Sequence, residues 1–171
     1  MRKGVVATGV EVLSRGYAPR VDDVCWLDAA ERRTWLALLG TTAALDAVLD
    51  RQLQRDAGMP LAYYQLLAML SEAPGRSLRM TELAEITQSS PSRISHAVKR
   101  LEARQWVLRR PCADDRRSTF AQLTDAGYAA LAAAAPAHVR AVREHLFDAL
   151  TAEQVAQLRE ILTAIAARIP D

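Results

Sequence analysis

The stretch that decides the fold is Thr81–Thr124, which reads TELAEITQSS PSRISHAVKR LEARQWVLRR PCADDRRSTF AQLT. Thr81 is a residue typical of N-caps, and the apolar periodicity after it predicts a short helix. A polar turn follows, and Ser90 is then expected to cap a second helix that has Pro91 at its first position and runs to about residue 104. The sequence therefore predicts two short helices joined by a tight turn.

The pattern changes after the second of these helices. Residues 106–110 and 119–123 have the composition of strands and flank a polar loop, which predicts a hairpin. Two helices joined by a tight turn and followed by a charged hairpin are the parts of a winged helix-turn-helix. The expected fold class is mainly α, with a small β-hairpin wing.

The helix expected after Ser90 has two chemically different faces. At 100° per residue, one face is apolar and holds Ile94, Ala97, Val98 and Leu101. Hydroxyl, imidazole and cationic side chains occupy the opposite face and its edges: Ser92, Arg93, Ser95, His96, Lys99 and Arg100. Such a face suits the DNA major groove, where the first turns of a recognition helix meet base edges. An ordinary solvated face is the alternative interpretation.

The distribution of charge favours the nucleic-acid interpretation. The chain holds 22 Lys and Arg against 20 Asp and Glu, a formal net charge of only +2. Residues 76–124 alone hold ten Lys and Arg against five Asp and Glu. Phosphate contact requires positive charge concentrated in this way.

The loop of the hairpin places two arginines beside acids. Arg116 and Arg117 follow Asp115, and Arg110 stands where the first strand ends. An arginine at such a tip can enter the narrow, electronegative minor groove while a carboxylate orients its guanidinium. A solvated loop of mixed charge is the alternative.

Several motifs in this region come in a specific order: Leu83-Ala84, Ser92-Arg93-Ile94-Ser95, Lys99-Arg100-Leu101-Glu102, Arg110, Asp115-Arg116-Arg117 and Leu123-Thr124-Asp125-Ala126-Gly127. This ordered set resembles the MarR-type multiple-antibiotic-resistance regulators. The resemblance implies a homodimeric winged helix whose terminal helices interlock, with the recognition helix in the major groove and a wing arginine in the minor groove. By position, Asp115 and Arg117 match the wing pair of the family.

Two positions depart from the family pattern. Ala62 stands where members usually have Thr, so the helix that Pro60 opens keeps only the Gln65 half of a capping box. Gln105-Trp106 replaces the Gly-Leu pair that usually ends the recognition helix, so a glycine C-cap is not available there.

The flanking segments are predicted to be helical. Asp28 and Glu31 have the spacing of an N-cap with a reciprocal acid and begin a helix over 29–56, and a second helix follows over 60–73.

Downstream, Thr124 is expected to cap a long Ala-rich helix bent at Pro136. Thr151 with Gln154 caps a last helix. Its apolar stripe consists of Val155, Leu158, Leu162, Ile165 and Ile169.

Together with the resemblance, these elements divide the chain into four parts. Residues 1–24 are an N-terminal extension, 25–58 a dimerisation helix, 59–124 the winged helix-turn-helix DNA-binding domain and 125–171 the C-terminal dimerisation helices.

Two sensing roles are hypotheses from the resemblance. Some relatives sense peroxides through a cysteine near the first helix that bonds to tyrosines of the second, and Cys25 with Tyr63 and Tyr64 is loosely similar. We interpret Cys25 instead as a small buried residue. Trp35, Tyr63 and Tyr64 are also candidates to line a pocket for a small aromatic effector, with helical core as their simpler role.

Other classes of function find little support in the sequence. Without a Gly-rich phosphate loop or a nucleophile elbow, we expect neither an enzyme nor a cofactor. His138 and His145 lack the further ligands that a metal site needs. No window approaches 18 consecutive apolar residues, so we expect no membrane span. Two cysteines without metal-ligand spacing favour a reducing, cytoplasmic setting.

The sequence therefore predicts a sequence-specific transcription regulator that binds a pseudo-palindromic double-stranded DNA operator as a homodimer, most often a ligand-responsive repressor in this family. One alternative is a winged-helix module that binds protein, which would need an apolar patch on the outward face of the second helix. The dimerisation piece of a methyltransferase is another, but no cofactor domain follows here.

Overall fold

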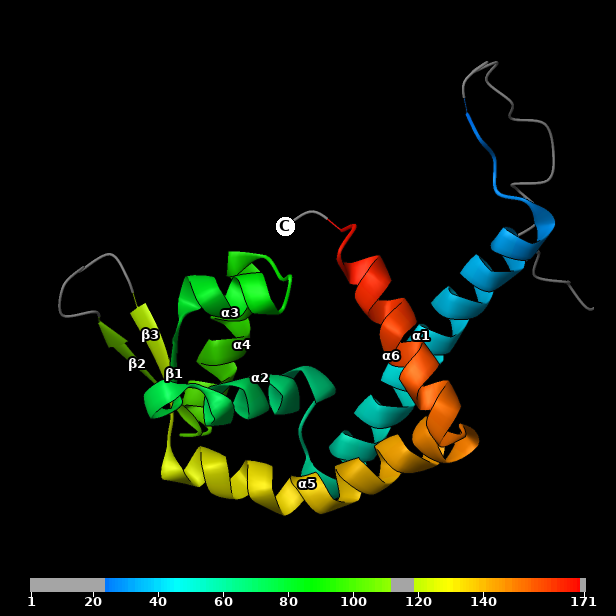
Figure 1. Ribbon diagram of the computed structural model, residues 1–171. Helices are drawn as coiled ribbons and strands as arrows, with labels where there is room; N and C mark the ends of the chain where they lie inside the picture. The colour runs from blue at the N-terminus through cyan, green and yellow to red at the C-terminus, as the bar shows by residue number, and fades with distance from the viewer. Residues whose placement is uncertain (1–23, 112–118, 170–171) are drawn as a thin grey trace, which may run out of the picture. The chain divides into compact units, whose positions relative to one another are not determined.

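The computed structural model describes residues 24–111 and 119–169 of the chain (Figure 1). The chain forms two compact units, residues 1–39 and 40–171, and the boundary between them falls inside the first helix, α1 (Ala29–Ala57). The helical, winged fold class predicted from the sequence is confirmed by the elements of the second unit.

The start of α1 has the predicted reciprocal cap. Asp28 Oδ1 accepts the N–H of Glu31 at 2.8 Å, and Glu31 Oε2 accepts the N–H of Asp28 at 2.8 Å. These bonds satisfy N–H groups that have no partner within the helix. At the other end, α1 stops before Gly58, whose φ of +62° reverses the chain.

At the N-terminus of the second helix, α2 (Leu61–Glu72), a free N–H group is satisfied by a residue of α1. Pro60 is the N-cap and Ala62 already lies inside the helix. The N–H of Leu61 donates to Asp50 Oδ1 of α1 at 2.8 Å. The expected lack of a hydroxyl cap is confirmed, but Pro60 rather than Ala62 is the N-cap, so Gln65 is not placed to supply the other half of a capping box.

The helix-turn-helix consists of α3 (Met80–Ile86) and α4 (Pro91–Ala103). The prediction that Thr81 caps the first of them is wrong, because the helix starts at Met80 with Arg79 as its N-cap. Glu82 Oε2 accepts the Arg79 N–H at 2.7 Å. Ser90 caps α4 as predicted, since its Oγ accepts the N–H of Arg93 at 3.4 Å.

The end of α4 has a glycine-type geometry without a glycine. Gln105 adopts a φ of +60°, and its N–H donates to the carbonyl of Glu102 at 2.8 Å. The N–H of Trp106 donates to the carbonyl of Leu101 at 3.0 Å. This pair of bonds is a Schellman motif, so the chain leaves α4 at the usual angle even though Gln105 carries a side chain.

The sheet has three antiparallel strands in the order β1-β3-β2, namely β1 (Ser77–Arg79), β2 (Val107–Pro111) and β3 (Thr119–Leu123). The predicted hairpin is confirmed, with Val107 opposite Leu123 and Pro111 opposite Thr119. The sequence analysis missed β1, which follows a short 3-10 turn, η1 (Pro74–Arg76), and is too short to have a recognisable period.

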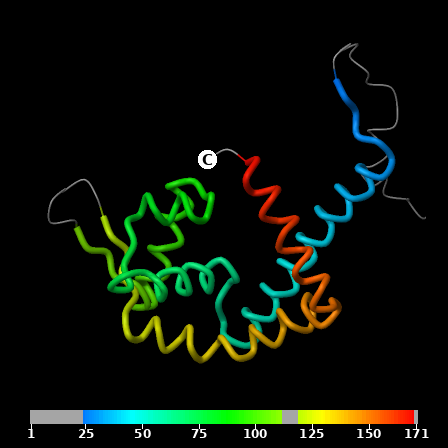
Figure 2. The backbone as a smooth tube through the Cα atoms, viewed as in Figure 1, coloured from blue at the N-terminus to red at the C-terminus, as the bar shows by residue number. Residues whose placement is uncertain are grey.

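After β3 the chain forms α5 (Asp125–His145), which runs beneath α2 in Figure 1 and which Thr124 caps as predicted by accepting the N–H of Gly127 at 2.9 Å. The helix continues through Pro136 as one curved element in Figure 2. A 3-10 turn, η2 (Phe147–Ala149), leads to α6 (Ala152–Ala166). The predicted Thr151–Gln154 capping box is present, with bonds of 2.9 and 3.2 Å.

The core of the second unit is formed by α1, α2, α3, α4, α5 and the sheet. Its fully buried side chains are Leu53, Met59, Leu67, Leu70, Leu83, Val98, Leu101 and Val107. By contrast, α6 contributes no buried residue. None of the helices in the described part of the chain is long and apolar enough to cross a bilayer.

Candidate nucleic-acid interface

The outward face of α4 is as polar as the sequence indicates. Its apolar side chains Ile94, Val98 and Leu101 are buried, whereas the predicted contact residues are all exposed: Ser92, Arg93, Ser95, His96, Lys99 and Arg100. The core therefore holds α4 by one face and leaves its hydroxyl, imidazole and cationic groups open to a partner.

Two hydroxyls on this face already have partners within the chain. Ser92 Oγ lies 3.1 Å from Ser90 Oγ at the N-terminus of α4. Ser95 Oγ lies 3.4 Å from Arg109 Nη2, which donates a shorter bond of 2.7 Å to the Ser95 carbonyl. These contacts orient both serines before any ligand arrives.

The hairpin adds one further candidate within the described residues. Arg110 is exposed on β2. The wing residues Asp115, Arg116 and Arg117 lie outside the described residues.

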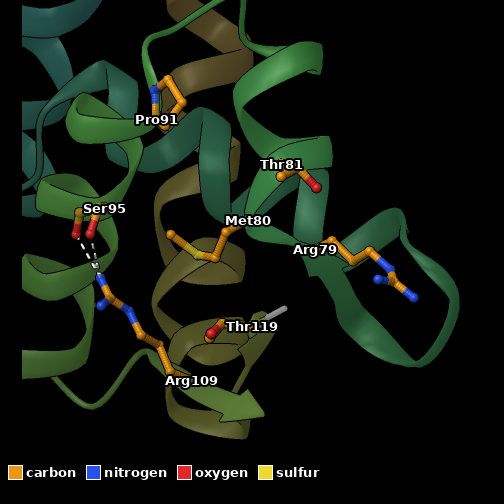
Figure 3. Close-up of a pocket in the computed structure, with 7 residues that line it drawn as sticks. All are labelled: Arg79, Met80, Thr81, Pro91, Ser95, Arg109 and Thr119. Carbon is orange, nitrogen blue, oxygen red and sulfur yellow. Dashed lines mark hydrogen bonds between the residues drawn. The ribbon is translucent and has the colours of Figure 1, made fainter. Parts of the chain in front are cut away.

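Arg109 is a residue of this surface that sequence reasoning counted for its charge but did not single out. Its side chain crosses from β2 to α4 and meets Ser95 (Figure 3). Beside it lies a cavity of about 250 Å³ whose lining includes Met80, Pro91 and Thr119. The alternation of a strand could have revealed this arrangement, because Arg109 and Arg110 must point to opposite faces.

Three other arginines of the basic segment lie over aromatic rings. The guanidinium of Arg76 is 4.1 Å from the centroid of the Tyr128 ring, and that of Arg79 is 5.2 Å from the Phe120 ring. Arg104 is 4.8 Å from the Trp106 ring and also donates to the carbonyl of Gly58 at 3.0 Å. Their charge adds to the local positive field, while their positions are fixed by the protein.

Comparison with known proteins decides the family. A sequence profile described as MarR family matches residues 57–118. Sco3205, a MarR family transcriptional regulator from Streptomyces coelicolor solved in complex with DNA, is 49% identical; the match covers 86% of this chain and 93% of that chain, with a TM-score of 0.83. The chain belongs to the MarR family of transcriptional regulators.

Two further solved structures are also similar, one of them, AbsC, described as a MarR family transcriptional regulator. AbsC, from the same organism, is 37% identical, with 84% of this chain and 97% of that chain covered and a TM-score of 0.79. The transcriptional regulator BldR from Sulfolobus solfataricus is 25% identical over 84% of this chain and 100% of that chain, with a TM-score of 0.72. A search of curated proteins found no match.

The structure corrects one expectation about the sensing residues of this MarR-family chain. Cys25 is exposed, so its interpretation as a small buried residue is wrong. It lies before α1, in a described segment, residues 24–28, that is assigned neither helix nor strand. Trp35, on α1 in the same unit, is 49% exposed.

The two candidate tyrosines lie in the other unit of this MarR-family chain. Tyr63 and Tyr64 pack against its core, and burial raises the pKa of the Tyr64 hydroxyl. The ring of Tyr64 is 4.3 Å from that of His138, and His138 Nδ1 lies 3.3 Å from Gln52 Oε1. Burial lowers the pKa of His138, so this site favours a neutral imidazole.

Proposed function

We propose that this protein regulates transcription by binding double-stranded DNA as a two-fold symmetric homodimer on a pseudo-palindromic operator. The observation that carries the proposal is the outward face of α4, which is exposed, basic and without a large apolar side chain. The DNA complex of Sco3205, 49% identical, supports the same activity here.

The residues divide into two kinds of contact. Ser92, Ser95 and His96 face outward from the first two turns of α4 and are the proposed readers of base edges in the major groove. Cations supply phosphate contacts and the salt dependence that these bring. The proposed cations are Arg93, Lys99, Arg100 and Arg110, with Arg116 and Arg117 at the wing and Asp115 orienting them.

The exposed apolar side of α6 supports the dimer. Ile161, Leu162 and Ile165 are 44–56% exposed, although their spacing is that of a packed helix face; Ile169, expected on the same stripe, lies beyond the end of α6. A 15-residue helix without buried residues has little to hold it in water, because isolated helices of this length are marginal. A second copy of the chain provides the missing partner surface.

The dimer also provides the means of regulation. The two recognition helices must stand roughly 34–36 Å apart to enter successive major grooves. An effector that favours another separation releases the DNA, and a coupling of about 1–3 kcal/mol is enough for this. We propose a cytoplasmic repressor of this ligand-responsive kind, with Trp35, Tyr63 and Tyr64 as candidates for an aromatic effector and Cys25 for redox sensing.

A protein-binding winged helix is the competing function. Such a module would present an apolar patch where α4 faces outward. The exposed side chains on that face are Ser92, Arg93, Ser95, His96, Lys99 and Arg100, which favours nucleic acid instead.

Titration with duplexes tests the proposal. The full chain is titrated with a random-sequence duplex and with genomic fragments, each at two salt concentrations. We expect some fragments to bind about 10³-fold or more tightly than random DNA, with affinity falling steeply as salt rises. Equal, salt-independent affinities, or no binding at low salt, would overturn it.

A further inference from the structure

Arg109 connects the wing to the recognition helix at two points. Its Nη2 donates to the carbonyl of Ser95 at 2.7 Å and lies 3.4 Å from the hydroxyl of the same residue (Figure 3). Its backbone N–H donates to Glu102 Oε1 at 3.2 Å, and its Nε lies 3.2 Å from Glu102 Oε2. Glu102 therefore holds both the main chain and the side chain of one strand residue.

The placement of the two α4 partners makes this a rigid connection. Ser95 and Glu102 are seven residues apart, which corresponds to about 10.5 Å along a helix axis. Because the backbone N–H and the guanidinium of one β2 residue meet α4 residues two turns apart, β2 has less freedom to turn about either contact. The Arg109 and Glu102 side chains are only 32% and 31% exposed, so water screens the ion pair less than it would at a fully open surface.

We propose that Arg109 is a positioning residue: it locks β2, and with it the wing, at a fixed angle to α4, and makes no phosphate contact itself. Its Nη2 donates to Ser95 and its Nε is buried within ion-pair distance of Glu102, whereas the neighbouring Arg110 is exposed. Arg109 also holds the Ser95 hydroxyl on the base-reading face of α4. The proposal rests on the proposed DNA binding.

The competing role is a direct phosphate contact, and it predicts different results for conservative variants. A lysine is a good phosphate ligand, so Arg109→Lys would keep the affinity of a contact residue. A single ammonium cannot replace the planar fork that reaches Ser95 while its Nε faces Glu102. If Arg109 is a positioning residue, Arg109→Lys should therefore lose DNA affinity. If Arg109 is a phosphate contact, Arg109→Lys should keep it.

The test compares Arg109→Lys and Arg109→Met with Arg110→Met in the full chain, using a duplex that the wild type binds specifically. We expect both Arg109 variants to lose about tenfold in affinity while the slope of log K against log salt stays at the wild-type value. Arg110→Met should lower that slope by about one for its lost phosphate contact. Thermal unfolding checks that each variant is folded at the assay temperature.

A second variant distinguishes loss of the Arg109–Glu102 contact from a general folding defect. Glu102→Gln keeps an acceptor for the Arg109 N–H but loses the ion pair, and combining it with Arg109→Met should cost no more affinity than Arg109→Met alone. Wild-type affinity in Arg109→Lys, a slope lowered by about one in Arg109→Met, or unchanged affinity in less stable Arg109 variants would overturn the positioning role. A wild type that binds no duplex would overturn the proposed function and this role with it.

Discussion

Among the described glycines, Gly127 is the one where an added Cβ would meet neighbouring atoms. A Cβ at this position would overlap the carbonyl oxygen of Trp106 and lie 2.8 Å from Leu123 Cδ1, because the first turn of α5 rests directly on the α4–β2 turn. Backbone cannot move aside as a flexible side chain would. Gly127→Ala should therefore lower the free energy of unfolding by about 2–3 kcal/mol, measured by urea denaturation. Gly40→Ala is the matched control inside α1.

The control should have the opposite sign. A Cβ at Gly40 meets nothing within 4 Å, so alanine there is expected to raise stability by about 0.5–1 kcal/mol. A neutral Gly127→Ala would contradict the close approach of α5 to Trp106.

Gln105 carries a conformational cost that glycine would remove. Its φ of +60° lies in the left-handed region, which costs an L-residue about 1–2 kcal/mol, while glycine loses about 0.5–1 kcal/mol more entropy on folding. Gln105→Gly should thus raise the urea midpoint by an amount equivalent to about 0.5–1 kcal/mol. Ala103→Gly, in the regular helix two residues earlier, should instead lose about 1 kcal/mol. Destabilisation by both substitutions would argue against the Schellman ending.

His138 should make stability depend on pH. Burial lowers its pKa in the folded state, whereas the unfolded chain titrates at the ordinary value of about 6.5. Below that value the unfolded state binds more protons, so stability falls as the pH drops from about 6.5 towards the folded pKa, and is fully present above it. Thermal unfolding at pH 7.5 and 5.5 should show a smaller drop for His138→Gln, and an unaltered drop for the exposed His145→Gln. If His138→Gln loses as much stability between pH 7.5 and 5.5 as the wild type, His138 is not the cause of the pH dependence.

At the scale of the elements, the caps could be predicted from the sequence because each is made within three or four residues. Ser90, Thr124 and Thr151 all cap the helices that follow them. The wrong cap at Thr81 is a local error of two residues, whereas two other errors come from partners distant in the chain: the N–H of Leu61 at the start of α2 donates to Asp50, and β1 exists because Ser77 pairs with Gln122 of β3. A local pattern cannot reveal such partners.

The same division applies to the candidate interface. The polar face of α4 follows from its period of 3.6 residues alone, which is why Ser92 and Lys99 are exposed as the pattern indicates. The connection of Arg109 to Ser95 and Glu102 needs the packed geometry of a strand against a helix. From the sequence alone, Arg109 was therefore recognised only as one of the positive charges of the basic segment.

At the scale of the whole molecule, the apolar stripe of α6 predicts that assembly and DNA binding fail together. Leu162 and Ile165 lie on that stripe and are 49% and 44% exposed in a single chain. Replacing both with Glu would place charges in the proposed dimer contact, where burial without a partner is costly. We expect a monomer in analytical ultracentrifugation at concentrations where the wild type is a dimer.

The matched control places the same two charges on the other side of α6, with Thr163→Glu and Ala167→Glu. At 100° per residue these exposed positions lie opposite the stripe, so the control should remain dimeric. Affinity for an operator should follow the assembly state, because a monomer contacts only one half-site and loses the contacts of the second reading helix. A monomeric variant that binds an operator as tightly as the wild type would show that one winged helix suffices, and the regulation by helix separation would then have no structural basis.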